Sequence, residues 1–220
     1  NADLNYLDFQ DQLLNFLQDS QIEDTSPRLI KDQNGTAVSN YRNESGSIFY
    51  VRLLTWIPGR LWSCVNPQLD DLRFSLGLKC GQLTNSLMGF DHPKAHRTFD
   101  WDIANSLWTK DSLDLFDKEQ RELVSYFQNL FESKKESYDQ LRKSIVHNDA
   151  NDNNIIVSND LIKPKVEALI DYGDAIYTQI INDLAVCCAY AIMHHHDPLE
   201  AALPIVKGYC QSFHILEEEL

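Results

Sequence analysis

Apolar side chains recur every three or four residues along several stretches of this chain, the period of an α-helix with one buried face. The first stretch runs from Asp3 to Gln18. The longest, from Phe116 to Gln140, places Leu123 and Phe127 on one face and charged residues on the other. Another follows Asn66-Pro67, a pair that favours a helix start. The pattern therefore predicts helices over 3–18, after Asn66-Pro67 through Leu87, and over 116–140, 184–193 and 197–211.

Shorter runs rich in β-branched and aromatic residues predict strands between these helices. Pro27–Ile30 and Ser47–Trp56 form one pair, joined by a polar connection from Lys31 to Gly46. Later in the chain, Ile145-Val146 and Val166–Ile170 are each followed at once by acidic and amide side chains. The residues that follow these two strands are His147, Asn148, Asp149, Asn151, Asp152, Asn153 and Asn154 in one case, and Asp171 and Asp174 in the other.

Carboxylates placed so densely repel one another unless cations or hydrogen-bond donors lie between them. Hard oxygen ligands at the ends of buried strands are what a magnesium–phosphate site requires. The spacing adds detail, because Asp149 and Asn154 form the pattern H-x-D-x-x-x-x-N, and Asp171 opens the tripeptide D-Y-G. In a catalytic loop of this kind the aspartate accepts a hydroxyl proton and the asparagine binds a metal ion. The cluster therefore predicts a centre for phosphoryl transfer.

The segments HNDANDNN, IDYGD and IND-LA together resemble the aminoglycoside phosphotransferase and choline kinase family, most closely its hydroxylysine kinase branch. The resemblance implies an α+β, protein-kinase-like fold, consisting mainly of the helical large lobe with a remnant of the small-lobe sheet. It implies two parts, a partial small lobe over residues 1–57 and a large catalytic lobe over residues 58–220. A fragment that lacks the first part of the small lobe is expected, because no phosphate-binding lysine or Gly-rich loop precedes the first helix. Such a fragment should bind nucleotide weakly.

The resemblance also implies roles for residues in the central cluster. Asp149 is the expected catalytic base, and His147 is expected to orient its loop. Asn154 and Asp171 are the expected ligands of Mg²⁺, which would bridge to ATP or possibly GTP. Asp183 is expected to brace the backbone around His147, although a helix N-cap is an alternative role for it. Asn148 stands where relatives commonly have glycine, and asparagine tolerates left-handed backbone conformations better than most residues.

The resemblance implies two further sites, each supported by a less specific motif. The segment Leu54-Thr55-Trp56-Ile57-Pro58-Gly59 is similar to the family's hinge between lobes. There the Thr55 carbonyl and the Ile57 N–H would face an adenine base with Leu54 beside it; the alternative is an ordinary strand followed by a Pro-Gly turn. In the first helix, Gln10 matches the position of an acidic residue that pairs with the missing lysine, and an exposed helix position is the alternative.

The candidates for binding the acceptor are an aromatic residue and several carboxylates. Trp101 and Asp102 would hold a cationic amine through a ring face and a negative charge. The alternative is that Trp101 belongs to the core and Asp102 caps a helix. Asp152 and Asp174 are further candidates for acceptor or metal contacts, with solvated loop carboxylates as the alternative.

Composition limits the partners. A net charge of −14 argues against nucleic acid or an anionic membrane as the main partner and is compatible with a cationic acceptor. The five cysteines show no disulfide framework or C-x-x-C pair, so a cytoplasmic location is expected. The longest apolar run is too short for a bilayer, and no signal peptide is predicted. The triplet 194–196 is histidine, but consecutive helical residues do not converge on one metal ion.

These observations predict an enzyme that phosphorylates a hydroxyl of an amino alcohol, hydroxy-amino acid or aminoglycoside and belongs to a longer chain with further domains. Two alternatives remain open. One is a non-catalytic, kinase-like module that binds or regulates within a larger protein. The other is a metal-dependent phosphohydrolase that uses the same carboxylates.

Overall fold

The computed structural model describes residues 3–20 and 25–220. The chain begins with helix α1 (Leu4–Asp19), capped by the Asp3 carboxylate, which accepts the Asn5 N–H at 3.0 Å. A three-stranded antiparallel sheet follows, with β1 (Leu29–Ile30) and β2 (Val38–Arg42) on either side of β3 (Ile48–Leu54). Strand β2 lies inside the segment that the sequence predicts to be a polar connection. That prediction was wrong because four of the five β2 residues, Ser39 to Arg42, are polar or aromatic and only Val38 is aliphatic.

The rest of the chain is mainly helical. Two small sheets lie among the helices: β4 (Arg60–Leu61), β6 (Ile155–Val157) and β7 (Val166–Leu169) form one, and β5 (Lys143–Val146) and β8 (Ile176–Gln179) form the other. In chain order the helical elements are η1 (Trp62–Cys64), α2 (Asp70–Leu87), η2 (Pro93–Ala95), η3 (Ile103–Leu115), α3 (Lys118–Asp139), η4 (Tyr172–Asp174), α4 (Ile181–Ala191), α5 (Pro198–Cys210) and η5 (Glu217–Glu219). The mixture of helices and small sheets agrees with the expected α+β class. The boundary at residues 57 and 58 stays a prediction.

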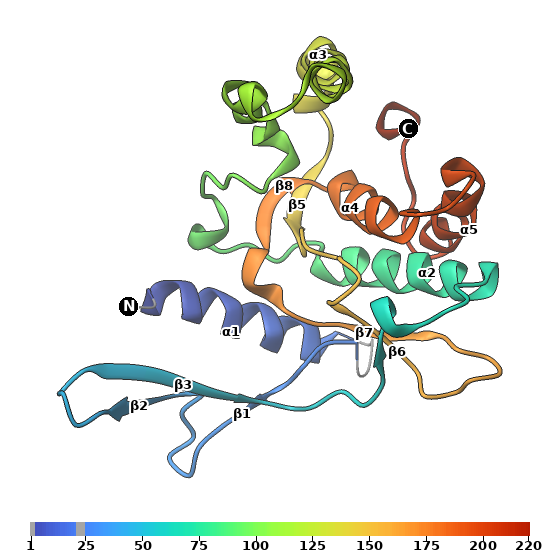
Figure 1. The fold of residues 1–220 in the computed structure, drawn as a ribbon. Coiled ribbons are helices and arrows are strands. Elements are labelled where there is room, and N and C mark those ends of the chain that lie inside the picture. Colours follow the sequence, from blue (N-terminus) through green and yellow to red (C-terminus); the bar gives the residue numbers. More distant parts are fainter. Residues whose placement is uncertain (1–2, 21–24) are drawn as a thin grey trace.

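The core forms where α1, α2, α4 and α5 meet the strands around the polar cluster (Figure 1). Phe9 and Leu13 of α1 are fully buried, as are Leu76 of α2 and Ile205 of α5. Helices α2 and α5 cross closely because glycine occupies the contact: a Cβ on Gly77 would lie 1.8 Å from the Ile205 carbonyl oxygen. This packing gives the strands β5 to β8 a rigid support.

Two helix predictions need correction. Helix α2 begins at Asp70, with Leu69 at its N-cap position and 62% exposed, so Asn66-Pro67 precedes the helix instead of starting it. Asp117 precedes helix α3 and forms a capping box, but Leu123 and Phe127 on the apolar face of the helix are 60% and 59% exposed. The reason is that α3 packs with η3, at a distance from the main helical core (Figure 1).

No helix in the described ranges is long and apolar enough to cross a lipid bilayer.

Candidate active site

The polar cluster lies where two loops connect the same two small sheets. The loop of residues 147–154 leaves β5 and enters β6, and the turn of residues 170–175 leaves β7 and enters β8. Strand β5 pairs with β8 so that Val146 lies opposite Ile176, and β6 pairs with β7 so that Ile155 lies opposite Leu169. All four of these residues are buried. The pairing therefore holds the two polar loops side by side.

A backbone hydrogen bond joins the two loops directly, since Ile170 N–H donates to the Asn154 carbonyl at 2.9 Å. His147 adds a second link, because its Nε2 lies 3.0 Å from the Ile170 carbonyl oxygen. Only a nitrogen that carries a proton can donate to a carbonyl, so Nε2 is protonated and Nδ1 accepts the Asp149 N–H at 3.2 Å. His147 is fully buried and both ring nitrogens are engaged. This geometry supports a role of His147 in orienting the loop.

Asp149 and Asn154 are in contact. The Asn154 side-chain Nδ2 donates to the Asp149 carboxylate at 2.7 Å and to the Asp149 carbonyl at 3.0 Å. The Asn151 amide donates to the other carboxylate oxygen at 2.8 Å. These contacts fix the Asp149 carboxylate and, in the ranges that the structure describes, leave Asn154 Oδ1 without a hydrogen-bond partner. The side chain of Asn154 can thus hold Asp149 with its nitrogen and bind a cation with its oxygen.

Asp171 lies at the start of the second loop in a left-handed conformation, with φ 64°. Its Oδ1 accepts the Gly173 N–H at 3.1 Å, and the residue is exposed. Asn148 in the first loop also has a left-handed backbone, with φ 67°. Asparagine adopts this conformation more readily than most residues. Positive φ at two residues other than glycine costs of order 1 kcal/mol each and is typical of functional loops.

The carboxylates interact electrostatically. Burial raises the pKa of Asp174 above its ordinary value, and the negative charge of Asp149 raises it further, whereas the positive charge of Arg97 opposes the rise. Asp152, by contrast, accepts a weak contact from Asn153 at 3.4 Å, and its backbone carbonyl accepts the Ser63 N–H. The structure thus brings Asp149, Asn154, Asp171 and Asp174 together and leaves Asp152 on the side of the loop that faces η1.

Asp183 lies in the first turn of α4, two residues after the helix begins. Its carboxylate accepts the N–H groups of His147 at 3.0 Å and Asn148 at 2.8 Å. It is 3% exposed, and burial raises its pKa. The carboxylate therefore holds the backbone at the point where β5 ends and the first loop begins.

The two acceptor candidates in the segment before η3 have different environments. Trp101 is 73% exposed, so it is not a core residue, and its carbonyl lies 3.4 Å from the Asn148 side-chain nitrogen. Asp102 is 5% exposed and caps η3 through the Ala104 N–H. Its Oδ1 also accepts the Thr178 hydroxyl at 2.9 Å. The helix-cap alternative therefore describes Asp102, whereas Trp101 has an exposed indole and a backbone carbonyl beside the first loop.

The hinge-like segment leaves β3 and borders an open cavity of about 520 Å³. Thr55 and Ile57 line this cavity; Leu54, 38% exposed, ends β3. The Thr55 N–H donates to the Arg28 carbonyl, and the Thr55 Oγ1 accepts the Arg28 N–H, both at 2.9 Å. Within residues 3–20 and 25–220, no hydrogen bond engages the Thr55 carbonyl or the Ile57 N–H, the two groups that the sequence predicts to meet a base.

Comparison with known proteins identifies the family. The sequence matches the phosphotransferase enzyme family over residues 4–218. The chain belongs to this family. Hydroxylysine kinase of Mus musculus is 28% identical over an alignment of 217 residues that covers 92% of this chain and 57% of that protein. The Bos taurus hydroxylysine kinase is 26% identical over 84% of this chain and 50% of its own length. The chain therefore spans about half to three-fifths of these relatives.

Solved structures share the fold of this phosphotransferase chain. A microcompartment-associated aminopropanol kinase superposes with a TM-score of 0.73 at 18% identity, over 99% of this chain and 68% of that one. The amicoumacin kinase hAmiN, solved in complex with AMP-PNP, Ca²⁺ and Ami, gives a TM-score of 0.70 at 17% identity, over 98% of this chain and 64% of that one. The kinase-like fold predicted from the two polar motifs is thereby confirmed.

Several residues around the site of this phosphotransferase were not found by sequence reasoning. Tyr6 of α1 donates its hydroxyl to the Gly173 carbonyl, and Arg97 stacks on the Tyr6 ring. Arg52 of β3 pairs with Asp11 of α1 at 2.7 Å and also donates to Gln10 at 2.7 Å. Gln10 is thus hydrogen-bonded and partly buried, so its description as an ordinary exposed residue was wrong. The only sequence signal was the buried face of α1, which contains Asp11 among apolar residues.

The histidine triplet lies beyond α4. His195 contacts the guanidinium of Arg73, and in the described part of the chain no group of three His, Cys, Asp or Glu side chains is arranged to hold a metal ion.

Proposed function

We propose that the full-length protein transfers the γ-phosphoryl group of ATP, or of GTP, to a hydroxyl of a small amino-bearing acceptor. The acceptor class comprises amino alcohols, hydroxy-amino acids and aminoglycosides, the kinds of molecule that the names of its relatives and structural neighbours indicate. The observation that carries the proposal is the fixed pair of Asp149 and Asn154 beside Asp171, on two loops that share a hydrogen bond.

The donor set fits a hard divalent cation. Asn154 has a carbonyl oxygen that no described residue engages, and Asp171 brings a full negative charge on an exposed carboxylate. These two residues would hold Mg²⁺ together with the nucleotide phosphates. When bound, Mg²⁺ supplies positive charge that offsets the negative charge of the transferring phosphoryl group.

Asp149 acts on the acceptor. Its carboxylate orients the hydroxyl and takes its proton while the acceptor oxygen forms a bond to the γ-phosphorus and the bond to the bridging β–γ oxygen breaks. The proton is then on Asp149, the phosphoryl group is on the acceptor, and the nucleoside diphosphate leaves. Trp101 would provide an aromatic face for the ammonium group of the acceptor, and Asp174 would provide a negative charge.

The test is transfer of labelled phosphate by the full-length protein, with Mg²⁺ and either ATP or GTP, to a panel of the three acceptor classes. Asp149→Asn keeps the size of the side chain and removes the base, so turnover should fall by roughly 10²–10⁴. Asp111→Asn, at an exposed position in η3, is the matched control and should leave turnover unchanged.

Three results would contradict the proposal. Tight, metal-dependent nucleotide binding without transfer to any acceptor would indicate a non-catalytic binding module. Phosphate release that needs no acceptor would indicate a hydrolase. An Asp149→Asn variant with the turnover of the wild type would remove Asp149 from the mechanism.

A further inference from the structure

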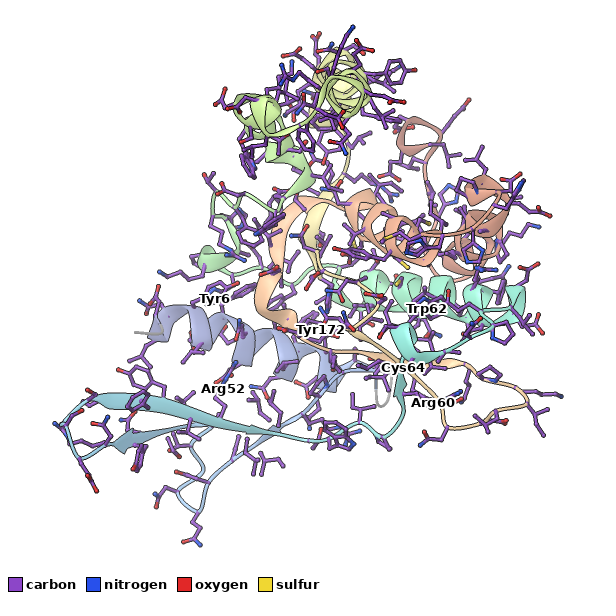
Figure 2. All side chains as sticks on the ribbon, viewed as in Figure 1. Tyr6, Arg52, Arg60, Trp62, Cys64 and Tyr172 are labelled. Atoms are coloured by element: carbon purple, nitrogen blue, oxygen red, sulfur yellow. The ribbon has the colours of Figure 1, made fainter. Side chains whose placement is uncertain are left out.

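Arg97 lies next to the site in a position that no catalytic motif identifies. Its guanidinium carbon is 4.7 Å from the ring centre of Tyr6 and 4.3 Å from that of Phe99. Figure 2 shows Tyr6 near the start of α1, beside the chain that carries Tyr172. Arg97 Nη2 donates to the Ala175 carbonyl at 3.3 Å, immediately after the D-Y-G-D turn. The cation is therefore held between two aromatic rings and touches the loop that contains Asp171 and Asp174.

Arg97 and Tyr6 both bind the backbone of the short segment from Gly173 to Ala175. The Tyr6 hydroxyl donates to the Gly173 carbonyl, and Arg97 donates to the Ala175 carbonyl. Arg97 also covers the Tyr6 ring, so each residue supports the other. The segment from Gly173 to Ala175 is thereby fixed to α1 on one side and to the segment before η3 on the other.

Arg97 forms no ion pair within 4.0 Å in the described ranges. Its positive charge nevertheless opposes the rise in the Asp174 pKa that burial causes. A direct ion pair would occupy the carboxylate oxygens. An arginine that stacks on rings and donates to a carbonyl offsets part of the negative charge at Asp174 and does not occupy its carboxylate oxygens.

We propose that Arg97 is a positioning residue for phosphoryl transfer: it holds the Gly173–Ala175 backbone through Tyr6 and Ala175 and offsets negative charge without binding a reactant. The expected effect on kcat rests on the proposed function, whereas the effect on the backbone does not. Misplacement of a metal-binding loop by about 1 Å is enough to lower turnover about 100-fold.

The experiment compares Arg97→Gln and Arg97→Lys in the full-length protein with Arg121→Gln as a matched control. Arg121 also donates to a backbone carbonyl, that of Phe116, but lies on the distant helix α3. Arg97→Gln should lower kcat about 10- to 100-fold, as expected for a residue that orients a metal ligand, with the KM values for nucleotide and acceptor within about threefold. Arg97→Lys retains the charge without the planar stack and should recover part of kcat.

A second readout does not depend on activity. Amide hydrogen exchange in the metal-free protein should become roughly tenfold faster over residues 171–176 in Arg97→Gln, with exchange in α5 unchanged. Tyr6→Phe, which removes only the hydroxyl bond to Gly173, should raise exchange over the same residues and serves if Arg97→Gln does not fold.

The outcomes separate the two proposals. A wild-type protein without transferase activity overturns the proposed function, whereas the exchange measurement still tests whether Arg97 holds the loop. Unchanged exchange over residues 171–176 in both variants would overturn the positioning role. An increase confined to the acceptor KM would also overturn it, because Arg97 would then bind the acceptor directly.

Discussion

At the scale of single residues, Asp183 shows how one buried carboxylate determines the shape of the polar loop of residues 147–154. It accepts two backbone N–H groups at the end of β5, and these donors have no access to water. The following residue, Asn148, adopts a left-handed conformation. The chain can turn sharply into the loop there because both donors remain satisfied on one side chain.

Asp183→Ala should therefore lower the free energy of unfolding by about 1–3 kcal/mol for each donor left unsatisfied. Asp183→Asn retains one acceptor oxygen and should have a smaller effect. Urea unfolding of the two variants beside the wild type measures this difference. An alanine variant as stable as the wild type would show that the loop does not need this brace.

Residue types alone predicted which polar side chains meet between the two loops, but they did not predict the contacts around them. Asp149, Asn154 and Asp171 follow directly from their spacing and from the strands before them. In contrast, Asp11 and Arg52 are 41 positions apart, and nothing in either local sequence pattern indicates that they pair. The sequence directed attention to Gln10, one residue away, because only the fold reveals which side chain of α1 faces β3.

At the scale of secondary-structure elements, α1 connects the three-stranded sheet to the D-Y-G-D turn. Arg52 lies between β3 and α1 (Figure 2) and binds Asp11 and Gln10. At the other end of the same helix, Tyr6 binds Gly173. Helix α1 thus couples the strand that leads into the hinge-like segment with the turn that carries Asp171.

Asp11→Asn should loosen this connection, because a charged hydrogen bond at a nearly buried site becomes a neutral one. We expect a loss of about 1 kcal/mol in unfolding free energy. Amide exchange along α1 should become roughly fivefold faster, the equivalent of that energy. Asp19→Asn, at an exposed position in the last turn of α1, is the control. Equal exchange rates in the two variants would contradict the coupling.

The helical periods predicted α1, α3 and α5 to within two residues, because a cap residue marks each start: Asp3, Asp117 and Asp197. The same periods could not tell which apolar faces are buried. The apolar face of α3 remains exposed because η3, with which it packs, is a narrow 3-10 helix without buried residues.

At the scale of the whole molecule, the C-terminal segment is fixed to the start of β5. Arg142 forms a two-pronged ion pair with Glu219, at 2.9 Å and 2.6 Å, and also donates to the His214 carbonyl at 2.8 Å. Burial alone would raise the pKa of Glu219, but hydrogen bonds from Arg142 and the Leu216 N–H outweigh it, so the pKa lies below its ordinary value.

A carboxyl whose pKa is depressed by folding contributes stability above its ordinary pKa of 4.5 and loses it as the pH falls through the lower, folded value. Glu219→Gln should therefore cost about 1 kcal/mol at neutral pH, since Arg142 is partly exposed and screened by solvent. The difference from the wild type should shrink steadily as the pH falls below the ordinary pKa. Thermal unfolding across this range measures it, and a constant difference at all pH values would contradict the assignment.

The sequence predicted the family and the fold because both polar motifs are local and occur in order. It could not predict how α1, the segment around Arg97 and the D-Y-G-D turn meet, because these contacts join residues up to 167 positions apart. Such contacts depend on the packing of the helical core.

We propose that the two loops hold a metal–nucleotide complex between Asn154 and Asp171, while Asp149 faces the acceptor. The most direct measurement is a crystal structure of the full-length protein with Mg²⁺ and a non-hydrolysable ATP analogue. We expect oxygens of Asn154 and Asp171 at about 2.0–2.1 Å from magnesium and the Asp149 carboxylate outside the set of magnesium ligands. A complex in which the metal and phosphates lie away from both residues would contradict it.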